Sequence, residues 1–180
     1  MEEEARLEQT ESGLAPTEPG WFVVNLGEGR WFRHEAFGAA CSFESKAARF
    51  PDLGINVHVL APGEPGCLYH GESNQEAYLV LWGECLLLVE GRERPLRQWD
   101  FVHLPAGTEH VAIGAGDGSC AILMVGARDP DRDIVYPVSE LAARHGASAE
   151  RETDSPAEAY ARFGEPKPGR PDGWDALPWA

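Results

Sequence analysis

Two histidines and two glutamates stand beside predicted turns in the middle of the chain, at His70, Glu72, Glu76 and His110. Residues i and i+2 of a strand share a face, so His70 and Glu72 converge on one point if the strand continues past the histidine. Glu76 enters the next predicted strand from the same end, and His110 follows a Pro-x-Gly turn that opens another strand. Two imidazoles and two carboxylates could enclose one divalent cation. The alternative is a polar interior in which these side chains form hydrogen bonds and hold no ion.

The elements that must position these side chains are short β-rich runs between Trp21 and about Val125, separated by Gly, Pro and Asp. The runs cover residues 21–25, 31–35, 40–43, 55–60, 67–70, 76–82, 85–89, 93–96, 100–104, 109–113 and 120–126. Turns that recur every ~8–12 residues are typical of an antiparallel sandwich or barrel. We therefore predict an all-β fold whose helices are confined to the region after Ser139.

Two glycines mark tight turns between consecutive strands of this barrel. Gly83 and Gly91 stand where a hairpin needs a positive φ, so the strands on either side pair antiparallel. In residues 77–82 apolar side chains stand at both odd and even positions, which indicates a strand buried on both faces. The outer face of such a strand needs cover, and sheet edges attract partners, so we expect a homodimer.

The two ends of the chain differ in composition from the barrel region. Residues 1–20 are acidic and rich in Pro and Gly, and we expect a flexible segment there. Ser139 and Ser155 are suited to cap two short helices, over 139–145 and about 155–163, after a possible edge strand at 133–138. The Pro-rich residues 164–180 are expected to lie on the barrel or on a partner subunit. The predicted organisation is thus an N-terminal segment 1–20, a barrel 21–138 and a C-terminal helical segment with a Pro- and Trp-rich tail, 139–180.

The region around the two histidines resembles the cupin superfamily, whose motifs are G-x5-H-x-H-x3-4-E-x6-G and G-x5-P-x-G-x2-H-x3-N. His70, Glu76 and Gly83 match the first motif, and Pro105, Gly107 and His110 match the second. The departures are Glu72 for the second histidine, Trp99 for the opening glycine of the second motif, Gly114 for its final asparagine, and Gly63, which sits one residue early. The resemblance covers about residues 55–125 and implies a double-stranded β-helix, the jelly-roll barrel of cupins.

The resemblance also implies a metal site, because cupins hold a divalent ion with the motif histidines and glutamate. His70, Glu76 and His110 carry over directly as ligands, whereas Glu72 carries over only by position, as a fourth ligand or as a catalytic base. A carboxylate in place of an imidazole favours Mn²⁺ or Fe²⁺ without excluding Zn²⁺ or Ni²⁺. The identity of the metal stays open.

Other polar and aromatic residues are candidates for the pocket around this ion. Tyr78 and Trp82 share the parity of Glu76, so we expect both in the pocket wall. Gln75 is either a donor that orients a ligand or an ordinary loop amide.

Three further side chains are possible members of the same pocket. His58 and His103 could line it, but a lone histidine on a strand is more often a surface or core residue. Cys67 has the opposite parity to His70 and is not expected to be a ligand.

Charge and composition exclude several classes of function. The 30 acidic residues against 15 basic ones give a net charge of −15, which repels a phosphate backbone, so we expect no nucleic-acid partner. No apolar run is long enough to span a membrane, and the start Met-Glu-Glu-Glu lacks the basic character of a signal peptide, so a cytoplasmic protein is expected. The four cysteines lie far apart without a CxxC pair, and we expect reduced thiols.

Three functions stay open at this point. The first is a metal-dependent enzyme acting on a small polar, sugar-like or carboxylate molecule, since the related cupins include isomerases, decarboxylases and dioxygenases. The second is a barrel that binds a small molecule without turnover. The third is a scaffold whose termini bind a partner protein. The fold does not choose among them, because function depends on the site.

Overall fold

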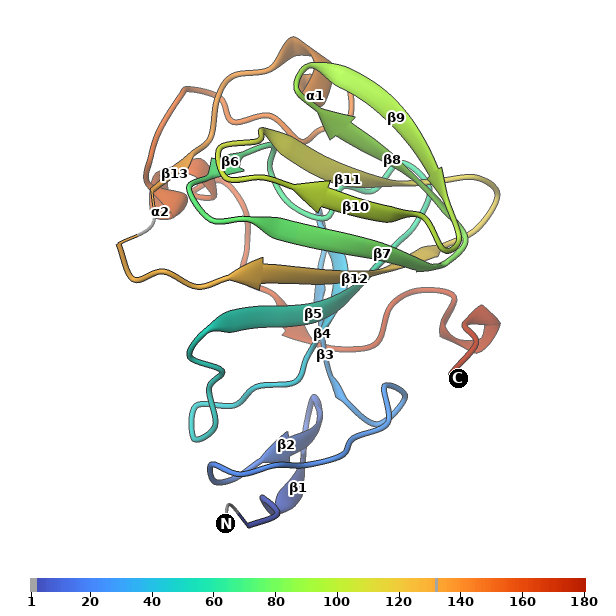
Figure 1. Cartoon of the computed structure of the whole chain (residues 1–180). Coiled ribbons are helices and arrows are strands. Elements are labelled where there is room, and N and C mark those ends of the chain that lie inside the picture. Colours follow the sequence, from blue (N-terminus) through green and yellow to red (C-terminus); the bar gives the residue numbers. More distant parts are fainter. Residues whose placement is uncertain (1–2, 132) are drawn as a thin grey trace.

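The chain folds as antiparallel β-strands with three short helical turns, in a computed structural model that describes residues 3–131 and 133–180 (Figure 1). The strands are β1 (Leu7–Thr10), β2 (Gly13–Pro16), β3 (Arg30–His34), β4 (Gly38–Ser42), β5 (Leu53–Leu60), β6 (Gly71–Glu72), β7 (Glu76–Trp82), β8 (Glu84–Val89), β9 (Arg92–Arg97), β10 (Phe101–Leu104), β11 (His110–Ala115), β12 (Cys120–Ala127), β13 (Ile134–Val135) and β14 (Lys167–Pro168). The helical turns are α1 (Glu140–Ala143), α2 (Pro156–Ala159) and the 3₁₀ turn η1 (Trp174–Ala176). None of the helices in the described part of the chain is long and apolar enough to cross a membrane.

Two facing sheets form the barrel. One has seven strands in the order β10-β7-β12-β5-β4-β3-β14, and the other has three in the order β11-β8-β9. A cluster of buried side chains joins them, with Tyr78 and Val80 of β7 and Ile122 of β12 on one side and Leu87 of β8 and Ala112 of β11 on the other. The all-β jelly-roll prediction is confirmed, since 42% of the residues lie in strands and 6% in helices.

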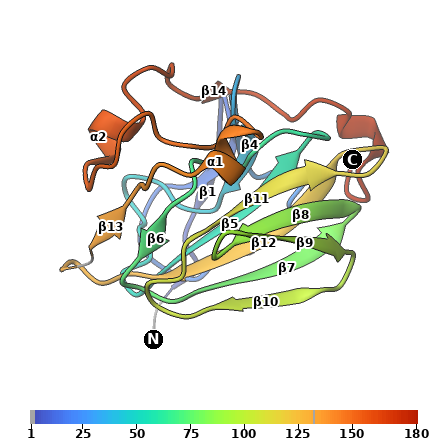
Figure 2. The ribbon, with the colours of Figure 1, turned by 90° about the horizontal axis from the view of Figure 1, so that it is seen from above.

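The outer faces of both sheets are covered by the C-terminal part of the chain. Ala142 and Ala147, around α1, pack on Leu88 and Val111 of the three-stranded sheet. The last residues cover the large sheet, where the ring of Trp31 lies 5.4 Å from Trp174 and 6.3 Å from Trp179 between centroids. Seen from above, the C-terminal segment follows the side of the barrel on which β4 and β14 lie (Figure 2). The tail therefore packs on its own barrel.

The predicted helix caps are confirmed. Ser139 caps α1 by accepting a hydrogen bond from Ala142 N–H, and Ser155 caps α2, with Pro156 at its first position. Both helices are shorter than predicted. All four cysteines carry free thiols, as expected.

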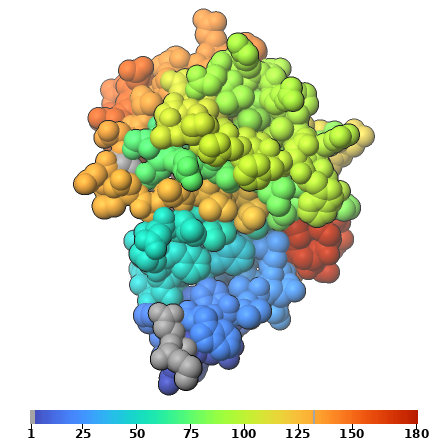
Figure 3. Space-filling view, in the orientation of Figure 1, coloured from blue at the N-terminus to red at the C-terminus, as the bar shows by residue number. Residues whose placement is uncertain are grey.

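The N-terminal segment differs from the prediction of a flexible chain. β1 and β2 pair as a hairpin, and Ser12 C=O accepts a hydrogen bond of 2.8 Å from Trp31 N–H at the start of the barrel. Figure 3 shows this hairpin, in blue, against the lower end of the barrel. Gly13 makes the approach possible, because an added Cβ would lie 2.1 Å from Gly29 C=O.

The strand predicted at 21–25 does not form. In this described segment, β pairing is limited to a single parallel bridge between Glu4 and Trp21. The barrel sheet begins later along the chain than predicted, at β3.

Gly114, which stands in place of the motif asparagine, is required by a close backbone contact. Its N–H donates to Glu64 C=O and its C=O accepts from Gly63 N–H, so the turn at 61–64 lies directly on β11. An added Cβ would lie 2.0 Å from Ala61 C=O. We expect Gly114→Ala to lower the free energy of unfolding by at least ~2–3 kcal/mol in urea denaturation, because backbone must move.

Gly118→Ala is the matched control, since an added Cβ there has no atom within 4 Å. Its effect should stay within about 0.5 kcal/mol. Equal denaturation midpoints for the two variants would contradict this explanation of Gly114.

Candidate metal centre

A pair of backbone hydrogen bonds brings the two motif histidines together. His70 N–H donates to His110 C=O at 3.2 Å, and His110 N–H donates to His70 C=O at 2.8 Å. This bridge ties the segment before β6 to the first residue of β11, and the two imidazole centroids lie 5.0 Å apart. Both histidines are buried, with exposed fractions of 8% and 1%.

Glu76, the first residue of β7, completes a compact group with these imidazoles. Its Oε2 lies 3.0 Å from His110 Nε2 and 4.0 Å from His70 Nε2. The three ligand atoms of His70, Glu76 and His110 all lie within 4.8 Å of one another. The structure thus brings together the three residues that the motifs predict as ligands.

The orientation of both rings is set by backbone carbonyls two residues earlier. His70 Nδ1 lies 2.8 Å from Leu68 C=O, and His110 Nδ1 lies 2.9 Å from Thr108 C=O. A carbonyl can only accept, so each Nδ1 carries a hydrogen and each Nε2 is the ring nitrogen on the side of Glu76. This is how histidines that ligate metals are usually oriented.

The donor set fits a divalent ion. Two imidazole nitrogens and a carboxylate that converge on one point are a donor set that divalent ions take in proteins. Tyr78 Oη lies 2.8 Å from His110 Nε2, and burial raises the pKa of this phenol well above its usual value, so Tyr78 stays protonated. The group could hold a Zn²⁺, Mn²⁺, Fe²⁺ or Ni²⁺ ion, and its chemistry does not select among them.

Glu72 lies beside this group rather than within it. It is held on β6, which pairs with β13 so that Glu72 stands opposite Ile134. Its Oε1 lies 3.8 Å from His70 Nε2, and 12% of the side chain is exposed. The Glu72 carboxylate therefore lies near the His70 imidazole, at the edge of the centre.

The centre opens into a small cavity of about 250 Å³ between β5, β7 and β12. Besides the centre, its wall contains backbone and side chains at Gly54, Asn56, His58, Cys67, Tyr78, Met124, Gly126, Ala127 and Arg128. Gly126 leaves room beside the glutamate, since an added Cβ would lie 3.4 Å from Glu76 Oε1. Several of the wall side chains are polar, which suits a small polar ligand.

Two predicted pocket residues are not in this wall, whereas Tyr78 is. Trp82 lies at the far end of β7 and is 38% exposed, because the register of β7 against β12 shifts between Val80 and Trp82. Such a bulge reverses the side-chain parity on which the prediction depended. Gln75 is exposed, and its C=O accepts a hydrogen bond from Ala127 N–H, as a loop residue would.

His58 lines the cavity, whereas a surface or core position was expected for it. Its Nδ1 is buried and has no hydrogen-bond partner in the described part of the chain. Burial lowers its pKa to about 4, so the imidazole is neutral at pH 7. The alternation of Asn56 and His58 with Val57 and Val59 on β5 is the signal that could have placed it. His103 is exposed, on the outer surface of β10.

Cys67 lines the cavity although its parity argued against this. Residues 66–69 form no strand, so alternation does not apply to them, and Cys67 Sγ lies 3.7 Å from His70 Nδ1. Burial, followed by the charges of Glu76 and Glu72, raises the pKa of this thiol. The protonated thiol faces the nitrogen that already donates to Leu68 C=O, which agrees with the prediction that Cys67 is not a ligand.

Comparison with known proteins places the fold in one family. Residues 56–126 match the cupin domain. No curated protein sequence matches the chain. Among solved structures, a candidate sugar phosphate isomerase of Acidithiobacillus ferrooxidans is 27% identical with a TM-score of 0.44, over 46% of this chain and 55% of that one, so the chain spans about half the length of that protein.

Two other solved structures share the fold at lower identity. The polyketide cyclase RemF of Streptomyces resistomycificus is 14% identical with a TM-score of 0.52, over 61% of this chain and 82% of that one. A predicted oxalate decarboxylase of Thermotoga maritima is 21% identical with a TM-score of 0.50, over 58% of this chain and 97% of that one. Both motifs, the jelly-roll barrel and the domain match fall on one segment, so residues 56–126 form a cupin domain.

Proposed function

We propose that this protein is a metal-dependent enzyme that acts on a small polar molecule, sugar-like or carboxylate in character. The observation that carries the proposal is the convergence of His70, Glu76 and His110 within 4.8 Å, where His70 and Glu76 line a cavity that also contains Asn56 and His58. A ligand set aimed into a cavity leaves coordination positions that a substrate can reach, as catalytic sites do. The cavity of about 250 Å³ limits that substrate to a small molecule.

The three motif residues would hold the ion, with Glu72 beside them. When bound, a divalent ion would supply a Lewis acid that polarises a carbonyl or enediolate oxygen. Glu72 is suited to accept or return a proton, because its carboxylate lies at the edge of the centre, 3.8 Å from His70 Nε2. We assign Glu72 as the catalytic base rather than the fourth ligand, since it lies outside the compact group.

Two neutral side chains would orient the substrate. Tyr78 keeps its hydroxyl hydrogen because burial raises its pKa, and it can donate to a substrate oxygen. His58 presents a neutral imidazole in the same cavity, and its buried Nδ1 has no hydrogen-bond partner among the residues that the structure describes. Such buried groups reject a substrate that cannot form hydrogen bonds with them.

The named activities of the solved cupins, isomerase, decarboxylase and cyclase, differ from one another. Isomerisation, decarboxylation and dioxygenation therefore stay predictions for this chain. So do the cytoplasmic location and the homodimer.

The exposed Phe101 on the edge strand β10, 67% accessible, supports a homodimer. A mass near 19.7 kDa by light scattering, which is the mass of a monomer, would count against it. The scaffold alternative loses support because Trp174 and Trp179 pack on Trp31 of the same chain.

Replacing His110 by alanine should remove the metal. The variant loses one imidazole ligand and leaves the Pro105-x-Gly107 turn in place, so we expect at least ~100-fold weaker metal affinity with the fold retained. Elemental analysis of protein purified without chelators measures the metal, and circular dichroism checks the fold. His103→Ala is the matched control, because this histidine is exposed and outside the cavity. Full metal content in His110→Ala, or no metal in the wild type, would overturn the proposal.

Replacing Glu72 by glutamine separates a base from a ligand. An amide cannot accept the proton, so we expect near-normal metal content with turnover lowered by ~10²–10⁴-fold on any substrate that the wild type converts. Glu76→Gln is the comparison, and it should lose metal. Loss of metal in Glu72→Gln would instead identify Glu72 as the fourth ligand. Metal retained by the wild type without turnover on sugars or small carboxylates would favour the binding-protein alternative.

A further inference from the structure

A second and larger hollow lies beside the metal cavity and is lined by cationic side chains. It measures about 770 Å³, within the range of pockets that bind small organic molecules. Its lining residues come from three separate segments of the chain: Arg30, Ser42, Glu44, Ser45, Lys46, Arg49, Pro51, Arg128, Asp129 and Pro130. Four cations and two carboxylates give this basic pocket a net charge of +2, in a chain whose net charge is −15.

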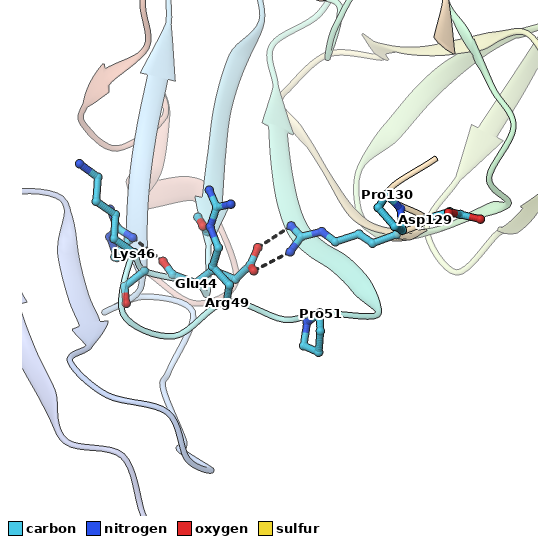
Figure 4. A pocket seen from close by; sticks show the side chains of 10 residues that line it. Glu44, Lys46, Arg49, Pro51, Asp129 and Pro130 are labelled. Carbon is cyan, nitrogen blue, oxygen red and sulfur yellow. Dashed lines mark hydrogen bonds and ion pairs between the residues drawn. The ribbon is translucent and has the colours of Figure 1, made fainter. Parts of the chain in front are cut away.

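The loop that carries two of the cations is held in a fixed shape. Glu44 accepts hydrogen bonds from Phe50 N–H at 2.7 Å and from both terminal nitrogens of Arg128, at 2.7 and 2.6 Å. Ser45 Oγ accepts from Ala48 N–H at 3.1 Å. Figure 4 shows the paired hydrogen bonds of Glu44 at the centre of the pocket. The loop therefore does not need to order itself when a ligand binds, which favours affinity.

Most of the positive charge is not neutralised. The carboxylate of Glu44 is committed to Arg128, and its pKa is lowered chiefly by that hydrogen bond. Arg30 donates to neutral acceptors, Glu44 C=O and Ser12 Oγ. Within the described residues, neither Lys46 nor Arg49 forms a hydrogen bond or an ion pair through its side chain. The carboxylate of Asp129 points away from Glu44 and Arg49 (Figure 4).

We propose that the basic pocket binds the phosphate group of a small soluble phosphate ester. Guanidinium and ammonium groups recognise phosphate by charge-assisted hydrogen bonds, and Arg49, Lys46 and Arg30 supply them from two sides. The volume exceeds what a bare anion needs, so the ligand carries an organic part. A membrane phosphate is disfavoured because the net charge of −15 is repelled by an anionic bilayer.

The position of the basic pocket indicates where the organic part of the phosphate ester lies. Arg128 lines both the basic pocket and the metal cavity, so a ligand anchored at Arg49 lies next to the mouth of that cavity. The phosphate site itself does not depend on the metal, because none of its residues belongs to the His70, Glu76 and His110 group. Its test can therefore be carried out with or without metal.

Calorimetry with glycerol 3-phosphate, with glycerol as the uncharged comparison, tests the proposal at low ionic strength. We expect saturable binding of glycerol 3-phosphate and none of glycerol, both before and after treatment with a chelator. Arg49→Gln should weaken binding by about tenfold, and the double variant with Lys46→Gln further. Arg94→Gln on the exposed surface of β9 removes the same charge far from the pocket and should leave the affinity unchanged.

The outcomes separate this proposal from the metal centre. Equal affinities for Arg49→Gln and Arg94→Gln, or no binding to the wild type, would overturn the phosphate site. Binding to vesicles containing phosphatidic acid without binding to glycerol 3-phosphate would also overturn it, in favour of a membrane ligand. A wild type that binds glycerol 3-phosphate but no metal would leave the phosphate site intact and remove the proposed enzyme.

Discussion

The reciprocal backbone hydrogen bonds between His70 and His110 are the interaction on which the rest of the site depends. They join a segment without regular structure to the first residue of β11 and set the imidazoles 5.0 Å apart. Each ring is then fixed by the same local contact, from its own Nδ1 to the carbonyl two residues earlier. With Nδ1 committed in this way, both Nε2 atoms must face Glu76.

This arrangement has an electrostatic consequence. The half-buried Glu76 carboxylate lies 3.0 Å from one imidazole nitrogen and 4.0 Å from another, which favours a proton or a metal cation held between these atoms. Among the described arginines, Arg128 lines the cavity and is bound to Glu44. A divalent ion would satisfy all three donors at once. The fold thus holds the ligand atoms of His70, Glu76 and His110 at fixed positions. The chemistry of the site depends on the cation that these atoms could bind.

Much of the site could be predicted from the sequence because its residues belong to motifs with fixed spacing. His70, Glu76 and His110 follow from turns and strand starts, where the local sequence determines the geometry. Trp82 could not be placed, because the bulge that turns it outward depends on the register between β7 and β12, which are about forty residues apart in sequence. For Cys67 parity was not a valid argument against a place in the pocket, because residues 66–69 form no strand and parity holds only within a strand. The structure of the terminal segments could not be predicted from the sequence. The β1–β2 hairpin and the C-terminal tryptophans contact Trp31 and its neighbours, and no local sequence pattern indicates these contacts.

X-ray absorption at the edge of the bound metal, in protein purified without chelators, would identify the atoms that bind the metal. The account predicts outer-shell scattering from two imidazoles and a first shell of nitrogen and oxygen only, at about 2.0–2.2 Å if the metal is zinc. It predicts no sulfur at about 2.3 Å, although the Cys67 thiol lies 3.7 Å from His70 Nδ1. A sulfur ligand, or a first shell without imidazole, would contradict the assignment of His70, Glu76 and His110 as the metal centre.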